Sequence, residues 1–196
     1  MYKAALRLLS VFVFLTGTFT GTSFASPSHE KVYLLRGFMN VFSLGMDQLA
    51  SELEQRGISA TVGNHLVSSS FASDAIQACK SGQISSIVIV GHSLGASAAV
   101  SMAEELQKAG VHVALIITFD PVVRTAVPPN VQRLKNFYFS NGVGAPVARG
   151  EHFHGMLQNV DLKDDPRLGH ISLAYSSAIH KQVLEYVAAA ASSHCR

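Results

Sequence analysis

Five residues in the middle of the chain, Gly91-His92-Ser93-Leu94-Gly95, have the spacing of a serine nucleophile presented on a sharp turn. A serine hydroxyl is a weak nucleophile, so it must stand clear of the backbone where a base can reach it. A tight turn from a strand into a helix exposes the hydroxyl, but it crowds the positions two before and two after the serine. Glycines at 91 and 95 remove the side chains that would clash there. The pattern therefore predicts that Ser93 is a nucleophile.

The residues on either side of this turn supply the context that it requires. Residues 86–90 form a short apolar run rich in β-branched residues, which is typical of a strand buried on both faces. Residues 94–106 are small and compatible with a helix. A helix that begins at Ser93 directs the backbone N–H of Leu94 toward developing negative charge, which makes Leu94 a candidate oxyanion donor. The alternative interpretation is a glycine-rich turn without chemistry, as occurs in many α/β proteins.

Composition limits the class of protein. The chain has 196 residues, of which 48% are hydrophobic and 14% are charged, with a net charge of +2. The apolar content suffices for one globular core. The charge is too small to favour nucleic acid or an anionic membrane surface as a partner. We therefore expect a single domain that binds no nucleic acid, and the sequence leaves its oligomeric state open.

The first 25 residues have the organisation of a secretory signal peptide. Lys3 and Arg7 make a positive start, residues 8–15 are apolar, and Ser23-Phe24-Ala25 places small residues at the two positions that a signal peptidase reads. We expect cleavage after Ala25, a mature domain at 26–196, and a secreted or periplasmic protein with no stable membrane span. The alternative is an uncleaved anchor, for which the apolar stretch is short.

Two cysteines remain in the mature chain, Cys79 and Cys195. An even number in an oxidising compartment permits one disulfide, which would tie the C-terminal tail to a helix in the first half of the chain. Two unpaired thiols are the alternative, because the sequence does not show whether the two residues approach each other.

Apolar periodicity and glycine punctuation predict alternating strands and helices. Strands are expected at residues 31–36, 58–62, 86–90, 111–119, 134–140 and 156–162. Helices are expected at residues 44–57, 74–80, 93–110 and 172–191. This alternation predicts a doubly wound, mostly parallel sheet of about six strands with helices on both faces, a three-layer α/β architecture.

The connections predict the order in which the strands lie. Right-handed crossovers favour the order 2-1-3-4-5-6, and we expect the first two helices on one face. The direction of winding then reverses between strands one and three, where ligands bind at the carboxyl ends of the strands. This places the loop at 37–39 beside Ser93, so two segments far apart in sequence meet where chemistry is expected.

Four short segments resemble the α/β-hydrolase superfamily, in its lipase, esterase and thioesterase branch. They are the turn at 91–95, Arg36-Gly37-Phe38 after the first strand, the Phe119-Asp120-Pro121 step, and the late Gly169-His170. The resemblance covers most of the mature chain in topology and only these segments in motif. It implies a minimal, lidless form that lacks the first two strands of larger members.

The resemblance also implies the order nucleophile, acid, histidine along the chain. His170 follows the last expected strand and precedes the last helix, where the family places its histidine, so we expect it to act as the base for Ser93. His152 and His154 form an H-x-H pair that could be read as metal ligands, but no third ligand lies at a telling spacing. The expected reaction needs no metal and no organic cofactor.

The sequence indicates the acid, the carboxylate that would orient His170, less directly than the nucleophile and the histidine. Many family members carry it after the strand that corresponds to 134–140, which here ends in Ser140-Asn141 without a carboxylate. Some lipases use an aspartate one strand earlier, in an Asp-Pro step, and Asp120 fits that pattern. A buried carboxylate there needs a partner, because an isolated one is costly. Asp120 is the expected acid, and Asp161 and Glu151 are its rivals.

The resemblance places the oxyanion hole at backbone N–H groups of Leu94 and of Phe38 or Met39. Related enzymes often have His-Gly before this position, where this chain has Arg36-Gly37. The departure leaves the backbone role intact and allows Arg36 to pair with an acid at the strand end.

Two functions follow as hypotheses. The first is a serine hydrolase that cleaves carboxylic esters or thioesters through a Ser-His-Asp triad and an acyl-enzyme, acting on a small ester or acyl substrate. The second is a catalytically inactive α/β-hydrolase fold that binds a ligand or partner. The sequence does not distinguish lipid esters, short esters, thioesters and amides, because the pocket walls come from loops.

Overall fold

The structure is a computed structural model that describes residues 30–38, 43–190 and 194–196. The signal peptide predicted at residues 1–25 lies outside the described residues, and so does Met39. Both therefore remain predictions.

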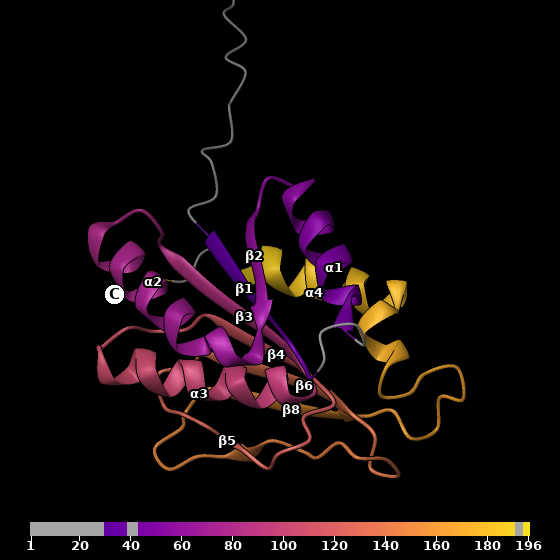
Figure 1. The fold of residues 1–196 in the computed structure, drawn as a ribbon. Helices are drawn as coiled ribbons and strands as arrows, with labels where there is room; N and C mark the ends of the chain where they lie inside the picture. The colour runs from indigo at the N-terminus through magenta and orange to yellow at the C-terminus, as the bar shows by residue number, and fades with distance from the viewer. Residues whose placement is uncertain (1–29, 39–42, 191–193) are drawn as a thin grey trace, which may run out of the picture.

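A six-stranded sheet forms the centre of the molecule, with strand order β2-β1-β3-β4-β6-β8 (Figure 1). Its strands are β1 (Glu30–Arg36), β2 (Ser59–Asn64), β3 (Ser86–His92), β4 (Leu115–Phe119), β6 (Arg133–Tyr138) and β8 (Met156–Asp161). Every neighbouring pair is parallel. The predicted order and the parallel α/β class are confirmed.

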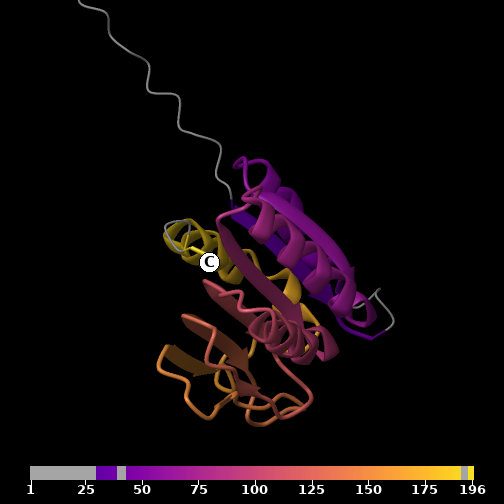
Figure 2. The ribbon, with the colours of Figure 1, turned by 90° about the vertical axis from the view of Figure 1, so that its left-hand side faces the viewer.

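Two layers of helices flank the sheet (Figures 1 and 2). The helices are α1 (Gly45–Glu54), α2 (Ser68–Ser81), α3 (Leu94–Lys108) and α4 (Ser177–Ala190), with short 3-10 turns η2 (His65–Val67) and η3 (Ser172–Tyr175). In the described part of the chain, none of them has the length and hydrophobicity to cross a bilayer.

The prediction that the first two helices share a face is wrong. Apolar residues of α1 pack in one core cluster with those of α4, whereas apolar residues of α2 pack in the other with those of α3. The chain moves one way along the sheet from β1 to β2 and the opposite way from β2 to β3. Two right-handed crossovers in opposite directions place their helices on opposite faces.

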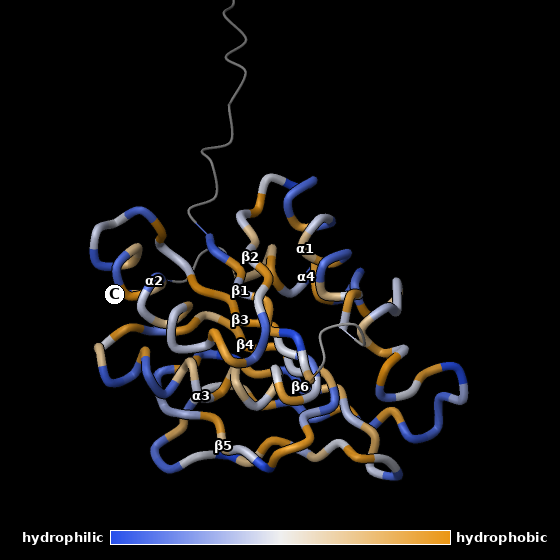
Figure 3. Tube along the Cα trace, in the orientation of Figure 1, coloured by the Kyte–Doolittle hydropathy of each residue, from blue (hydrophilic) through white to orange (hydrophobic). Residues whose placement is uncertain are grey.

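Alternation along the strands supplies both core clusters. In β1, Val32 and Leu34 face the α1 and α4 side, while Tyr33 and Leu35 face the α2 and α3 side, and all four are buried. Side chains point to opposite faces at successive positions, so a continuous apolar run suits a strand covered on both sides. Figure 3 shows hydrophobic residues concentrated in the central strands.

Several elements differ from the prediction. Helix α2 follows η2 directly and begins at Ser68 rather than at residue 74. Its first residues are rich in serine and lack apolar periodicity, so the sequence pattern did not indicate that they are helical. The fourth strand begins at Leu115 rather than at residue 111, and Val113 makes only an isolated bridge to Val131. Two short strands, β5 (Ala126–Val127) and β7 (Ala148–Arg149), pair with each other outside the main sheet.

Cys79 and Cys195 form a disulfide between α2 and the C-terminal tail. Of the two alternatives left by the sequence, the structure therefore shows the bonded pair. The tail is also held by backbone hydrogen bonds, because Cys195 N donates to Ser85 O at 2.6 Å and Cys195 O accepts from His112 N at 3.0 Å. The end of the chain is thus joined to segments that precede the central strands β3 and β4, at the end of the sheet opposite the turn at Ser93.

Glu30, the first residue of β1, is a buried carboxyl group at 2% exposure. Within the described residues neither of its carboxyl oxygens has a hydrogen-bond partner, and burial raises the pKa of Glu30 from 4.5 to about 7. The folded state keeps the Glu30 proton to a higher pH than the unfolded state does. The contribution of Glu30 to the free energy of unfolding is therefore fully present below about pH 4.5 and is lost as the pH rises toward 7.

We therefore expect the free energy of unfolding to fall by about 2–3 kcal/mol between pH 5 and pH 8 through Glu30. Urea denaturation of the wild type and of Glu30→Gln at both pH values measures this contribution. The variant is expected to lose less stability than the wild type over this interval. Equal losses in the two proteins would show that Glu30 ionises freely in the folded state.

Candidate active site

Ser93 lies on the turn between β3 and α3, with a positive φ of 58° and a ψ of −121°. A Cβ on Gly91 would lie 2.2 Å from Gly95 O, and a Cβ on Gly95 would lie 2.0 Å from Leu35 O. Neither position accepts a side chain, as predicted from the motif. Ser93 N donates to Phe119 O at 2.9 Å, which joins the turn to the end of β4. The hydroxyl is thus held at the carboxyl end of the sheet.

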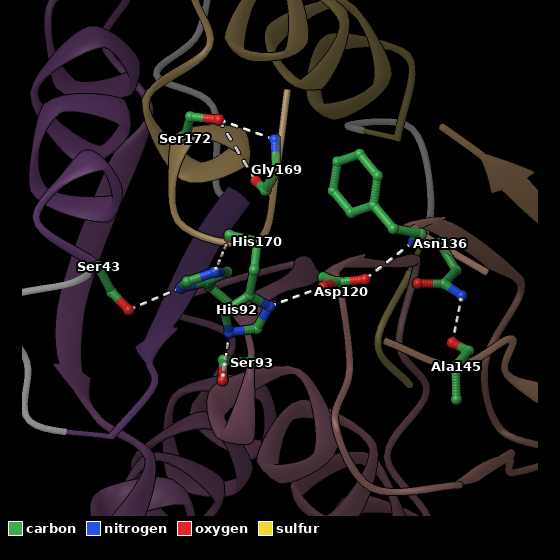
Figure 4. A network of polar contacts seen from close by, with 10 residues as sticks. Ser43, His92, Ser93, Asp120, Asn136, Ala145, Gly169, His170 and Ser172 are labelled. Atoms are coloured by element: carbon green, nitrogen blue, oxygen red, sulfur yellow. Dashed lines mark hydrogen bonds and ion pairs between the residues drawn. The ribbon is translucent and has the colours of Figure 1, made fainter. Parts of the chain in front are cut away.

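Ser93, His170 and Asp120 lie in one hydrogen-bonded row, as Figure 4 shows. Ser93 Oγ is 3.1 Å from His170 Nε2, and His170 Nδ1 is 2.6 Å from Asp120 Oδ2. A carboxylate only accepts hydrogen bonds, so Nδ1 carries the imidazole proton. Nε2 then presents its lone pair to the Ser93 hydroxyl. The three residues selected from the sequence therefore meet in the structure.

Asp120 is fully buried just after β4, and its backbone φ is 49°. Its Oδ1 accepts from Phe139 N at 2.9 Å, and its own N donates to Phe137 O at 2.7 Å. Both carboxyl oxygens thus have partners, as a buried carboxylate requires. The backbone that follows β6, where many relatives are expected to carry their acid, here donates a hydrogen bond to Asp120 instead.

The two rival acids lie elsewhere. Asp161 accepts from Ser140 Oγ at 2.5 Å and from Ser140 N at 3.1 Å, and the hydroxyl contact above all lowers the pKa of Asp161. Glu151 is exposed and lies 3.3 Å from His152 Nε2. Among the described residues, no group of three or more His, Cys, Asp or Glu is placed to hold a metal ion.

His170 lies on the loop between β8 and η3, with its side chain 30% exposed. The loop is closed locally, because Gly169 N donates to Ser172 Oγ at 2.8 Å and Leu173 N donates to Gly169 O at 2.9 Å. At this exposure, part of the His170 side chain is accessible to solvent. Hydrogen bonds therefore hold the loop that carries His170, while its imidazole ring stays partly accessible to solvent.

His92 connects this loop to the opposite wall of the site. Its Nε2 donates to the backbone O of His170 at 2.8 Å, so its Nδ1 accepts from Ser43 Oγ at 2.7 Å. Ser43 Oγ in turn accepts from Gly37 N at 3.1 Å. Burial lowers the pKa of His92 to about 4, so the ring is neutral at physiological pH. Ser43 was not predicted from the sequence, because a single serine in a loop forms no recognisable pattern.

Gly37, directly after β1, lies beside Ser93, as predicted. A Cβ on Gly37 would lie 2.8 Å from Ser93 Cβ, so a glycine is needed for this approach. A cavity of about 200 Å³ lies here, lined by Phe38, Ser43, His92, Ser93, His170 and Ile171. Leu94 is the first residue of α3, where backbone N–H groups have no acceptor within the helix. Of the two expected oxyanion residues, Phe38 thus lines the cavity with Ser93, and Leu94 follows Ser93 at the start of α3.

Arg36 pairs with Asp47 in the first turn of α1. Its Nε donates to Asp47 Oδ2 at 2.8 Å, and a second nitrogen contacts Asp47 Oδ1. The expected pairing of Arg36 with an acid is confirmed, with the acid on a helix rather than at a strand end. The pair ties the end of β1 to α1.

For the ester or thioester hydrolysis expected from the sequence, we predict that His92→Phe lowers kcat by roughly tenfold. The phenyl ring keeps the volume but leaves the His170 carbonyl and the Ser43 hydroxyl without this partner. Because His92 is neutral well above its pKa of about 4, the loss is expected to be the same at pH 6 and pH 8. Steady-state kinetics at both pH values, with the exposed His112→Phe as control, measure it. A loss of kcat at only one of the two pH values would contradict the role of His92 as a neutral positioning residue.

No protein-family model matches the chain, and no curated protein matches it. Several solved structures are similar to it. The type II thioesterase BorB from the borrelidin biosynthetic cluster superposes with a TM-score of 0.51 at 12% identity, over 83% of this chain and 94% of that chain. A cutinase-like protein from Cryptococcus sp. superposes with a TM-score of 0.50 at 13% identity, over 85% of this chain and 96% of that chain.

At such low identity these similarities concern the fold. Both extend over nearly the whole length of the other protein. The strand order of the sheet agrees with the order predicted from the chain connections, and the sharp turn at Ser93 agrees with the motif at residues 91–95. Taken together, these observations show that the chain has the α/β-hydrolase fold.

Proposed function

We propose that this protein is a serine hydrolase that cleaves carboxylic esters or thioesters through an acyl-enzyme. The observation that carries the proposal is the row of Ser93 Oγ, His170 and the buried Asp120, joined at 3.1 and 2.6 Å. A hydroxyl, a correctly oriented imidazole and a carboxylate that fixes the imidazole are the parts that such a reaction needs. The thioesterase and cutinase-like neighbours support hydrolysis of thioester or ester bonds in general.

In the first half of the proposed reaction, His170 Nε2 removes the hydroxyl proton as Ser93 Oγ attacks the substrate carbonyl carbon. The carbonyl oxygen becomes an oxyanion, which accepts hydrogen bonds from the backbone N–H groups of Leu94 and Phe38. The imidazolium then gives its proton to the leaving alcohol or thiol, and the bond from that oxygen or sulfur to the carbonyl carbon breaks. Asp120 stabilises the imidazolium throughout.

In the second half, His170 removes a proton from a water molecule that attacks the acyl-enzyme. The tetrahedral intermediate collapses, the proton returns through His170 to Ser93 Oγ, and the carboxylic acid leaves. No metal or organic cofactor takes part in these steps. His92 and Ser43 hold the backbone of His170 and of Gly37 in place.

We also propose that the protein acts outside the cytoplasm, in the periplasm or after secretion. The organisation of residues 1–25 supports this location, with cleavage after Ala25. The disulfide between Cys79 and Cys195 is in keeping with it, because disulfides persist mainly in oxidising compartments.

A panel of p-nitrophenyl esters of increasing acyl length, together with acyl thioesters, tests the proposal on the purified protein. We expect turnover of at least one member well above the buffer rate, with an initial burst of p-nitrophenol if release of the acyl group limits the rate. A folded protein that hydrolyses none of these compounds would favour the inactive ligand-binding alternative.

A further inference from the structure

The segment that follows β6 folds back over the end of β4, where Asp120 lies. Ala145 N donates to Pro121 O at 2.9 Å, which brings Gly144 against the Asp120 side chain. A Cβ on Gly144 would lie 1.6 Å from Asp120 Oδ1 and 2.4 Å from its Cγ. The three atoms nearest to that position all belong to the Asp120 carboxyl group. The carboxylate thus fills the space that any side chain at 144 would need.

Polar side chains on three adjacent strands fix this segment. Thr118 on β4, Asn136 on β6 and Asn159 on β8 lie side by side in the sheet register. Thr118 Oγ1 donates to Asn136 Oδ1 at 2.9 Å, and Asn136 Nδ2 donates to Asn159 Oδ1 at 2.8 Å. These three side chains form a polar ladder across the carboxyl half of the sheet.

The ladder binds the backbone of the segment directly. Asn136 Nδ2 donates to Ala145 O at 3.1 Å (Figure 4). Asn159 Oδ1 accepts from Val147 N at 2.9 Å, and Asn159 Nδ2 donates to Val147 O at 3.0 Å. Three hydrogen bonds therefore hold residues 145 and 147, and Gly144 is held next to Asp120 by its neighbours.

We propose that Gly144 is a positioning residue for the acid: its missing side chain leaves the room in which the Asp120 carboxylate faces His170. This inference rests on the proposed function, since it assigns the acid its place in the same reaction. Phe139 N holds Oδ1, His170 holds Oδ2, and the Gly144 backbone closes the remaining side. A methyl group at 144 must displace the carboxylate or lift the segment from the ladder, and either change moves Asp120 relative to His170.

Gly142 offers a matched control in the same segment. A Cβ there would lie 3.4 Å from Phe139 Cβ and 3.6 Å from Phe139 O, which are ordinary contact distances. Neither glycine has a backbone φ in the left-handed region, so alanine is free of backbone strain at both positions. The two substitutions therefore differ in whether they meet the Asp120 carboxylate.

In the full-length protein we expect Gly144→Ala to lower kcat by about 100-fold, because a shift of about 1 Å in a supporting group has effects of this size. Gly142→Ala is expected to keep wild-type kcat. The low-field proton NMR resonance of the hydrogen bond between His170 Nδ1 and Asp120 should shift or broaden in Gly144→Ala only. Wild-type kcat in Gly144→Ala, or equal losses in the two variants, would overturn the inference.

A double variant keeps the test decisive if Gly144→Ala is poorly folded. In an Asp120→Ala background the carboxylate is gone, so adding Gly144→Ala should lower neither the residual rate nor Tm further. A second loss in that background would overturn the inference, because it would show a clash with something other than Asp120. The NMR resonance and the Tm coupling are measurable even if no substrate is hydrolysed, so failure of the proposed function is distinguishable from failure of this inference.

Discussion

Ser93→Ala is expected to lower kcat by at least about 10⁴-fold on any ester or thioester that the wild type hydrolyses. Alanine keeps the Cβ and the backbone of the turn, with its φ of 58°, and removes only the oxygen that attacks the carbonyl. His170 and Asp120 retain their hydrogen bond at 2.6 Å. The fold and substrate binding should therefore persist, with KM and Tm close to the wild-type values.

The matched control is Ser101→Ala, which removes an exposed hydroxyl from the same helix, α3. We expect wild-type kinetics for this variant. Steady-state kinetics of the three proteins on one substrate make the comparison, with Tm measured for each. If Ser93→Ala retained most of the wild-type rate while remaining folded, Ser93 would not be the nucleophile.

Asp120→Asn is expected to lower kcat by about 10⁴-fold with little change in the fold. The amide oxygen can still accept the hydrogen bond from Phe139 N, so the NH₂ group turns toward His170. An amide NH₂ donates, which forces His170 Nδ1 to become the acceptor and moves the ring proton to Nε2. The nitrogen that faces Ser93 Oγ then has no lone pair to receive its proton.

The rival acids provide the controls for this prediction. Asp161→Asn and Glu151→Gln remove one carboxylate each from positions that do not contact His170 in the structure. Both variants are expected to keep kcat within about twofold of the wild type, because surface substitutions far from the site have small effects. A large loss in either variant, with Asp120→Asn near the wild-type rate, would transfer the role of the acid to that residue.

Most of the fold was predictable because it depends on local sequence patterns. The apolar run before Ser93 and the small residues after it identified β3, the turn and α3, and chain connectivity gave the strand order. The faces of the first two helices were predicted wrongly, because the reversal of winding after β2 also switches the side of the crossover. The start of α2 was missed, since Ser68 to Ser70 carry no apolar periodicity.

The supporting residues of the site could not be predicted from sequence. Ser43 contacts His92, which lies 49 positions away in the sequence, and Gly144 lies against Asp120 from a separate segment. Their roles depend on contacts that form only when the chain folds. Asn136 and Asn159 looked like ordinary polar residues in strands, and their pairing depends on the register of β6 and β8. The three residues of the hydrogen-bonded row could be predicted because motif, chain order and topology all select Ser93, Asp120 and His170.

Whether Ser93 is an activated nucleophile is tested by the intact mass of the purified protein after exposure to a fluorophosphonate, with Ser93→Ala treated in parallel. Such reagents phosphonylate a serine that is activated by a neighbouring base, and they release fluoride. We expect one adduct on the wild type, located at Ser93 by peptide mapping, and none on Ser93→Ala. A well-folded wild type that gains no mass, or an adduct that persists in Ser93→Ala, would contradict this expectation.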